Sequence, residues 1–361
     1  MIQSNPVLGL RNLMSSVRTG NASNLQSQRR VSVVQDIRMA NSKPTISLSL
    51  KALNPDPLVE CIACPGEVST WVNAVAISPD GFTFVCDRHD TDLQLWDLKK
   101  GQPLLTLTGH SAMISTLAFS PNGRTIASGS YDKSIKGWDL INGSLLFTLK
   151  GHRAGVNAVA ISANGETLVS GSDDRTIRVW NLPQRKLLHT LKGGTAGVQA
   201  IAISPDGQTC FSGGGDRLIR AWNLAKGKHL YTLKGHQSGV NALALSQDGH
   251  TLVSGGNDRA IQVWNLNNGQ ILHTLEGHAA PISAIAIRSD GQTLFSSSKD
   301  NTIRVWSLEH GTHLRTLKGH FNYVSSALAL DQAGNTLISG GTGIPLKIWS
   351  VINASSKKLS A

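Results

Sequence analysis

Four sets of His, Ser and Asp recur along the chain with the same internal spacing, and these are the residue types of a serine hydrolase. In each set Ser follows His by 18 residues, Asp follows it by 22 and a Trp follows it by 28. A serine nucleophile needs a His as its base and a carboxylate that orients the imidazole ring. The four sets are His110, Ser128, Asp132 and Trp138; His152, Ser170, Asp174 and Trp180; His236, Ser254, Asp258 and Trp264; and His278, Ser296, Asp300 and Trp306.

The number of copies argues against catalysis at these sets. A catalytic set normally occurs once, in a cleft that also holds an oxyanion site. Four equivalent copies are typical of a part that is repeated for structural reasons. We therefore predict that the sets are structural and that the chain is not an enzyme. The alternative is a hydrolytic site at the mouth of a central channel, which would need one asymmetric cluster of carboxylates or His, and the sequence shows none.

A repeat of 42 residues positions the four sets along the chain. A Trp recurs at this interval from Trp96 to Trp306, and Trp349 follows after 43 residues. Gly-His pairs keep the same interval and begin at Gly109, Gly151, Gly235, Gly277 and Gly319. Units of about 40–45 residues with Gly-His early and Trp late are typical of propeller blades. Each unit is too small to bury its own apolar face, so neighbouring units must stack.

One unit shows how the sequence predicts a blade. Short apolar or alternating segments cover Val240–Ser246, Thr251–Ser254, Ile261–Asn265 and Gln270–Leu275. Each alternation is typical of a half-buried strand. Gly, Asn and Asp separate the segments, and these residues favour tight turns. Four strands with three tight turns form one antiparallel blade.

Seven such units predict an all-β, seven-bladed β-propeller of four-stranded antiparallel blades over residues 58–352. The segment at 58–64 precedes the first inner strand, and the chain ends soon after the third strand of the last unit. We therefore expect this N-terminal strand to complete blade seven and close the ring, which removes two exposed sheet edges. Residues 1–57 are predicted to be a disordered basic tail or an over-extended start, and residues 353–361 a disordered C-terminal tail.

These repeats resemble those of the WD-repeat β-propeller family. The Trp-Asp pair itself occurs at Trp96 and Trp138, becomes Trp-Asn in the next three units and Trp-Ser in the last two. The resemblance implies that each set is a buried tetrad in which Asp contacts His, His contacts Ser, and Ser contacts the indole N–H. An unpaired buried polar group costs about 1–3 kcal/mol, so a complete tetrad would stabilise its blade. The resemblance also implies a non-catalytic scaffold that binds a partner protein or peptide on one loop face.

Three units depart from the tetrad pattern. Blade four has Gly194 at the His position, and blade one has Val68 and Cys86 at the His and Ser positions. Blade seven has Gly343 in place of Asp. Because blades one and seven flank the closure, we expect the ring to open there first.

Charge and composition give weak support for other functions. The net charge is +11, but residues 1–57 hold seven basic and two acidic residues, so the excess is concentrated outside the repeats. A nucleic-acid reader gathers its basic residues on one face, so nucleic acid is not expected as a partner, although binding through the basic tails remains an alternative. Cys61 and Cys64 form a single C-x-x-C without a second ligand pair, so no metal is expected, and the motifs suggest no cofactor.

The first 35 residues lack Asp and Glu, which resembles an organellar transit peptide. We favour a disordered tail and a cytoplasmic protein, with an organelle as the alternative. No apolar run approaches the roughly 18 residues that span a bilayer, so no membrane association is expected.

The units disagree most at their loops, and this difference predicts a partner site. The residue before the inner strand is bulky in blades seven, one and two, which are neighbours in a closed ring, whereas it is Gly in blades three to five. Aromatic residues and Arg are enriched at interface hot spots. The predicted patch consists of Trp71, Arg88, His89, Met113, Tyr131, Phe321 and Tyr323. The alternative is that the aromatic residues only stabilise blades one and seven. We expect a monomeric propeller that works within a larger complex.

Overall fold

The computed structural model describes residues 58–63, 72–318, 324–341 and 346–352. These residues belong to one compact unit of the chain, Leu53–Ala361. The predicted tails at 1–57 and 353–361 lie outside the described residues, so their boundaries stay predictions.

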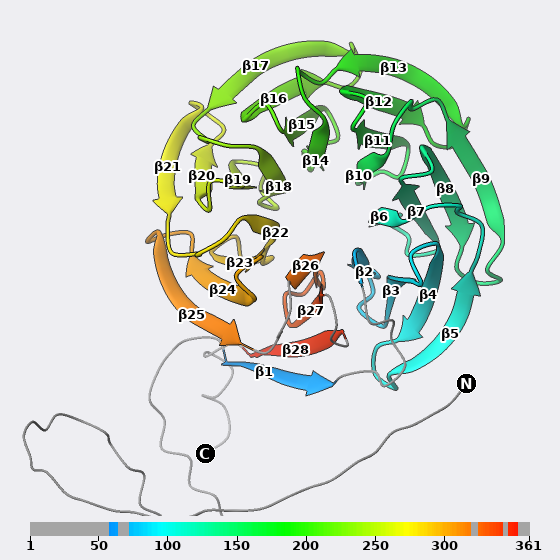
Figure 1. Cartoon of the computed structure of the whole chain (residues 1–361), viewed down its shortest axis with the longest axis horizontal. Coiled ribbons are helices and arrows are strands. Elements are labelled where there is room, and N and C mark those ends of the chain that lie inside the picture. Colours follow the sequence, from blue (N-terminus) through cyan, green and yellow to red (C-terminus); the bar gives the residue numbers. More distant parts are fainter. Residues whose placement is uncertain (1–57, 64–71, 319–323, 342–345, 353–361) are drawn as a thin grey trace, which may run out of the picture. The chain divides into compact units, whose positions relative to one another are not determined.

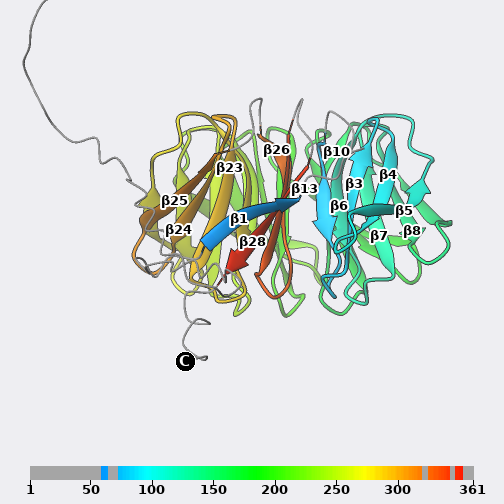
Figure 2. The same ribbon diagram turned by 90° about the horizontal axis from the view of Figure 1, so that it is seen from below.

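The described residues form seven four-stranded antiparallel sheets arranged as a ring, and the innermost strands are β2, β6, β10, β14, β18, β22 and β26 (Figure 1). Seen from the side, the sheets stand around the ring like the blades of a propeller (Figure 2). The predicted fold class is therefore confirmed.

Blades one to three consist of β2 (Val75–Ile77), β3 (Thr83–Arg88), β4 (Asp92–Asp97) and β5 (Gln102–Leu107); β6 (Ile114–Phe119), β7 (Thr125–Ser130), β8 (Ser134–Asp139) and β9 (Leu145–Lys150); and β10 (Val156–Ile161), β11 (Thr167–Ser172), β12 (Thr176–Asn181) and β13 (Lys186–Lys192). Blades four to six consist of β14 (Val198–Ile203), β15 (Thr209–Gly214), β16 (Leu218–Asn223) and β17 (Lys228–Lys234); β18 (Val240–Leu245), β19 (Thr251–Gly256), β20 (Ile261–Asn265) and β21 (Gln270–Leu275); and β22 (Ile282–Ile287), β23 (Thr293–Ser298), β24 (Thr302–Ser307) and β25 (Thr312–Lys318). Blade seven consists of β26 (Val324–Leu330), β27 (Thr336–Gly341), β28 (Lys347–Ile352) and β1 (Leu58–Ala63).

The turn after each inner strand follows directly from the sequence. In blade five the Asp248 carboxylate accepts hydrogen bonds from the Ser246 hydroxyl at 2.5 Å and from the His250 N–H at 2.9 Å. Gly249 has a φ of +74°, a conformation that Gly adopts without steric cost. This turn reverses the chain between β18 and β19, as the sequence predicts.

The apolar core lies between neighbouring blades. One cluster joins Phe211, Ile219, Ala221 and Leu233 of blade four to Val240, Leu252 and Trp264 of blade five. In blade four the close approach of blade five requires a Gly on the second strand, because a Cβ on Gly213 would lie 2.6 Å from Val240 Cγ1. The repeated Trp and the repeated Gly therefore both serve the packing of one blade on the next.

Blade seven combines strands from the two ends of the repeat region. Its order is β1-β28-β27-β26, and β1 runs antiparallel to β28 with Leu58 opposite Ile352. In Figure 1 the blue strand β1 therefore lies beside the red strand β28. Cys61 is in β1, opposite Trp349, whereas Cys64 lies outside the described residues. Within the part of the chain that the structure describes, no helix has the length and apolar character to span a membrane.

Candidate functional site

The hydrogen bonds implied for the four tetrads are present in the structure. In blade two His110 Nδ1 lies 2.7 Å from Asp132 Oδ2, and His110 Nε2 lies 2.7 Å from Ser128 Oγ. The indole N–H of Trp138 donates to the same Ser128 Oγ at 2.9 Å. The sets around His152, His236 and His278 repeat these three contacts at 2.7–3.1 Å.

Burial and hydrogen bonding decide the protonation of the tetrads in blades two and three. Burial lowers the pKa of His110 and of His152, although the carboxylate beside each ring opposes this shift. Burial alone would raise the pKa of Asp132, but hydrogen bonds from Ser134 and His110 outweigh it and lower that pKa to about 2. In these two blades a neutral ring therefore donates its Nδ1–H to an ionised Asp, since a carboxylate can only accept. Nε2 then accepts from the Ser hydroxyl, and the Ser oxygen accepts from the indole.

This arrangement has the connectivity of a catalytic triad, but its serine is inaccessible. Ser128, Ser170, Ser254 and Ser296 are each 0% exposed. A nucleophile must reach the scissile carbonyl of a bound substrate. Because the hydroxyl of each set is enclosed and already holds an indole N–H, these four sets cannot act on a substrate. Their interactions join the second strand, the third strand and the preceding loop of one blade.

Blade four replaces the missing His with an Arg. The guanidinium of Arg220 lies 2.8 Å from Asp216 Oδ2 and donates to the Gly193 carbonyl at 3.0 Å. A Cβ on residue 194 would lie 2.2 Å from that same Asp216 oxygen. Ser212 still accepts the indole N–H of Trp222 at 2.9 Å. The predicted gap in blade four is therefore filled by an ion pair.

Blades one and seven retain only parts of the tetrad. In blade one the indole N–H of Trp96 has no hydrogen-bond partner among the described residues, and the neighbouring Cys86 is 1% exposed. Asp90 is exposed and has a φ of +66°. In blade seven Ser339 accepts the indole N–H of Trp349 at 2.8 Å. Val68 and Gly343 lie outside the described residues. The expectation that the ring opens first at blades one and seven stays a prediction.

Three residues of the predicted partner patch lie together. The carbonyl of Asp90, which follows His89, accepts the N–H of Ile114, which follows Met113. The Met113 carbonyl in turn accepts the N–H of Tyr131 at 2.9 Å. Tyr131 is 43% exposed and His89 is exposed.

The remaining members of the patch differ. Arg88 is half-buried and donates to Gln94 Oε1 of its own blade at 3.1 Å, so its guanidinium is held within the blade. Trp71, Phe321 and Tyr323 lie outside the described residues, and their role stays a prediction.

Tyr131 also lines a cavity enclosed by the inner strands, with a volume of about 480 Å³. Asn257 and Lys299 line the same cavity and occupy the repeat position of Tyr131, directly before the tetrad Asp. Asp173 occupies this position in blade three, and its charge contributes to the raised pKa of Tyr131 after burial. The sequence analysis missed Lys299, Asn257 and Asp173. A comparison of all units at the repeat position of Tyr131 and His89 would have found them.

Neutral amides and hydroxyls form much of the cavity wall, and several of them join adjacent blades. The side-chain amide of Asn157 donates to the Val198 carbonyl of the next blade, and that of Asn241 donates to the Ile282 carbonyl. Ser115 donates to the Val156 carbonyl in the same way. Among the described residues, no group of three or more His, Cys, Asp or Glu side chains is arranged to hold a metal ion. His313 contacts Thr316 Oγ1 at 2.9 Å and packs edge-on against Trp306.

Comparison with known families matches six of the repeats. The model of the family "WD domain, G-beta repeat" matches residues 60–97, 101–139, 143–181, 185–223, 227–265 and 269–307. A search of the curated proteins found no match to this chain. The matched ranges cover more than half of the chain, and the structure adds a seventh blade of the same topology. The chain is therefore a member of the WD-repeat family and folds as a seven-bladed propeller.

Proposed function

We propose that the chain is a non-catalytic scaffold that binds a partner protein or peptide on the loop face around the central cavity. Propellers of this family are typically protein-interaction scaffolds. The enclosed serines of the tetrads support a role without catalysis at those sets. Within a larger complex, this propeller would hold its partner in a fixed position.

The observation that carries the proposal is the position of Tyr131. Its half-exposed ring lies at the cavity and is joined through backbone hydrogen bonds to the segments that carry Met113 and His89. Tyr is enriched at interface hot spots because one end is apolar and the other is polar. Lys299 and Asp173 add both signs of charge at equivalent positions of other blades. A rigid apolar anchor next to charged residues is typical of a protein-binding surface.

The proposal is tested by co-purification with the full chain from its own cells. The comparison includes the double variant Met113→Ala/Tyr131→Ala and the control variant Leu230→Ala, whose side chain is 47% exposed on the outer strand of blade four. We expect specific proteins to be retained by the wild type and the control and lost from the double variant. Met113 and Tyr131 are partly buried, so the double variant should melt a few degrees below the wild type and the control but remain folded at the temperature of the assay. Retention of the same proteins by all three chains would reject this face.

A second pair of variants tests the two alternatives for the aromatic residues of the predicted patch. Trp71→Ala and Tyr323→Ala should remove the partner without a large change in melting temperature if these residues bind. A large fall in melting temperature would instead assign them to the stabilisation of blades one and seven.

A further inference from the structure

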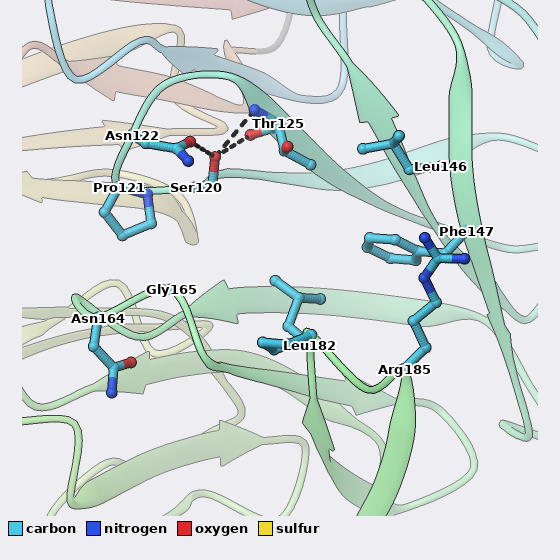
Figure 3. Close-up of a pocket in the computed structure, with 11 residues that line it drawn as sticks. Ser120, Pro121, Asn122, Thr125, Leu146, Phe147, Asn164, Gly165, Leu182 and Arg185 are labelled. Atoms are coloured by element: carbon cyan, nitrogen blue, oxygen red, sulfur yellow. Dashed lines mark hydrogen bonds between the residues drawn. The ribbon is translucent and has the colours of Figure 1, made fainter.

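A cleft of about 380 Å³ lies between blades two and three (Figure 3). Its walls are the first turn of blade two, the outer strand β9, and the turn between β12 and β13 of blade three. In antiparallel blades these turns lie at the strand ends opposite to the loops that carry the tetrad His and Asp. The cleft is therefore separate from the face around the central cavity.

Arg185 departs from the repeat at the edge of this cleft. It has a φ of +55°, and the corresponding residues of five other blades are glycines with φ between +61° and +74°. The five are Gly101, Gly143, Gly227, Gly269 and Gly311. Arg175, Arg217 and Arg259 also have positive φ, in the turns before the third strands, so Arg185 is distinguished by its replacement of a repeated Gly and not by its backbone conformation. The guanidinium lies over the Phe147 ring, 5.9 Å from its centroid, and Figure 3 shows the two side chains together.

Phe147 explains why a cleft opens at this junction. A Cβ on Gly137 would lie 2.1 Å from the Phe147 ring. The ring therefore occupies the space that, in blades one and three to six, the side chain at the repeat position of Gly137 fills. At two other junctions, the residue that corresponds to Phe147 on the outer strand packs against the turn between the third and fourth strands of the next blade. A Cβ on Gly227 would lie 2.7 Å from the His189 ring, and one on Gly311 would lie 2.6 Å from that of His273. Because the Phe147 ring turns into its own blade, the space beside the Arg185 turn remains open.

Two further departures remove negative charge from the same cleft. Asn122 and Asn164 line it, whereas blades one, four, five and six have Asp at this position of the turn. Asn122 accepts the same hydrogen bonds as Asp248, from the Ser120 hydroxyl at 2.7 Å and the Arg124 N–H at 3.0 Å. The turn therefore keeps its geometry and loses its charge.

The charge around the cleft is consequently positive. The negative charge of Glu166, two residues after Asn164, is balanced by the positive charge of Arg124, two residues after Asn122. Neither of these side chains lines the cleft. Arg185 is the one charged side chain in its lining. Leu146, Phe147 and Leu182 provide apolar surface next to it.

We propose that this cleft is a second binding site, which takes a segment of a partner protein that presents a bulky apolar side chain beside a carboxylate. The apolar side chain packs against Phe147 and Leu182, and the carboxylate pairs with Arg185. Arg binds carboxylates through charge-assisted and often bidentate hydrogen bonds. Residues 1–57 of this chain carry seven basic and two acidic residues, and this net positive charge disfavours them at a positively charged cleft, so we assign the occupant to another protein. The inference rests on the proposed function as a protein scaffold.

The test uses a phage-displayed library of random twelve-residue peptides, selected on the full chain. Binding of each selected peptide is then measured on four variants. Arg185→Gly restores the residue of the other blades, and Asn122→Asp/Asn164→Asp restores the repeated Asp, so both variants are expected to fold with an undiminished melting temperature. Lys226→Ala removes an exposed positive charge from the equivalent turn of blade four and is the matched control. Met113→Ala/Tyr131→Ala reports on the cavity face.

We expect one class of peptides to bind at least about tenfold more weakly to Arg185→Gly, which is the usual effect of losing a hydrogen bond to a charged group. These peptides should carry Asp or Glu close to a large apolar residue, weaken on the double Asp variant, and bind normally to the control and cavity-face variants. A selection without any peptide sensitive to Arg185→Gly would overturn the cleft proposal. Sensitive peptides that lack a carboxylate would overturn it as well. Peptides sensitive only to the cavity-face variant would leave the proposed function intact, so the two failures are distinguishable.

Discussion

Removal of the tetrad serine should cost more in blade two than in blade four, because the two hydroxyls satisfy different numbers of buried groups. Ser128 contacts both His110 Nε2 at 2.7 Å and the Trp138 indole N–H at 2.9 Å. Ser212 accepts only an indole N–H from the opposite strand, at 2.9 Å, because blade four has no His. Each buried polar group left without a partner costs about 1–3 kcal/mol. We therefore expect Ser128→Ala to lower the free energy of unfolding by about 4 kcal/mol and Ser212→Ala by about 2 kcal/mol.

The assay is urea unfolding of the full chain, monitored by circular dichroism and by Trp fluorescence. The dependence of the free energy of unfolding on urea concentration is compared between the variants. The two substitutions remove the same atom from the same strand position, so packing losses cancel in their difference. Equal losses would show that the His contact contributes nothing to stability. A Ser128→Ala chain as stable as the wild type would refute the structural role of the tetrad.

Three further outcomes follow from the described residues. Burial raises the pKa of Asp87 to about 6, so the folded state binds this proton more tightly than the unfolded state, and the resulting stability decreases as pH rises from about 4 to 6. Asp87→Asn keeps an oxygen acceptor. The variant should be more stable than the wild type by up to about 3 kcal/mol at pH 7, and the two should be nearly equal in stability at pH 4. A difference in the free energy of urea unfolding that does not depend on pH would be inconsistent with the raised pKa. Cys86→Ser offers Trp96 the acceptor that it lacks and should raise stability by about 1 kcal/mol, whereas a lower melting temperature would show that the hydroxyl is not satisfied there. A chain that begins at residue 58 should melt with the full chain, and one that begins at residue 64 should melt lower because β28 loses its partner β1; identical melting of the two would contradict a closing role for β1.

Much of the fold could be predicted because the same physical problem is solved seven times. Each unit must place a Trp, a small residue and several turns at fixed positions to pack on its neighbour, so the period reveals the strands. The spacing from His110 to Ser128 and Asp132 recurs in three other units and identifies the residues of the tetrads, and the resemblance to the WD-repeat family implied their hydrogen bonds. The pairing of β1 with β28 could be predicted because the last unit has only three strands and one extra strand precedes the first unit.

The features that the sequence analysis missed depend on tertiary contacts of single side chains. Arg220 and the equivalent Arg178 of blade three both donate to the carbonyl of a repeated Gly, but Arg220 also pairs with Asp216, whereas the equivalent Asp174 is bound by His152. Arg88 was predicted at the partner face, and the sequence did not reveal its hydrogen bond to Gln94 of the adjacent strand β4. The cleft depends on how Phe147 fills the space above Gly137, which a residue pattern cannot show before the strands are paired.

The central claim is that the loop face at Tyr131 holds a partner protein. The most direct measurement places a photo-crosslinking phenylalanine derivative at position 131 in the full chain within its own cells, with the same residue at position 230 as the control. We expect a defined covalent adduct with a partner protein from position 131 and none from position 230. Absence of an adduct at 131, or the same adducts from both positions, would contradict it.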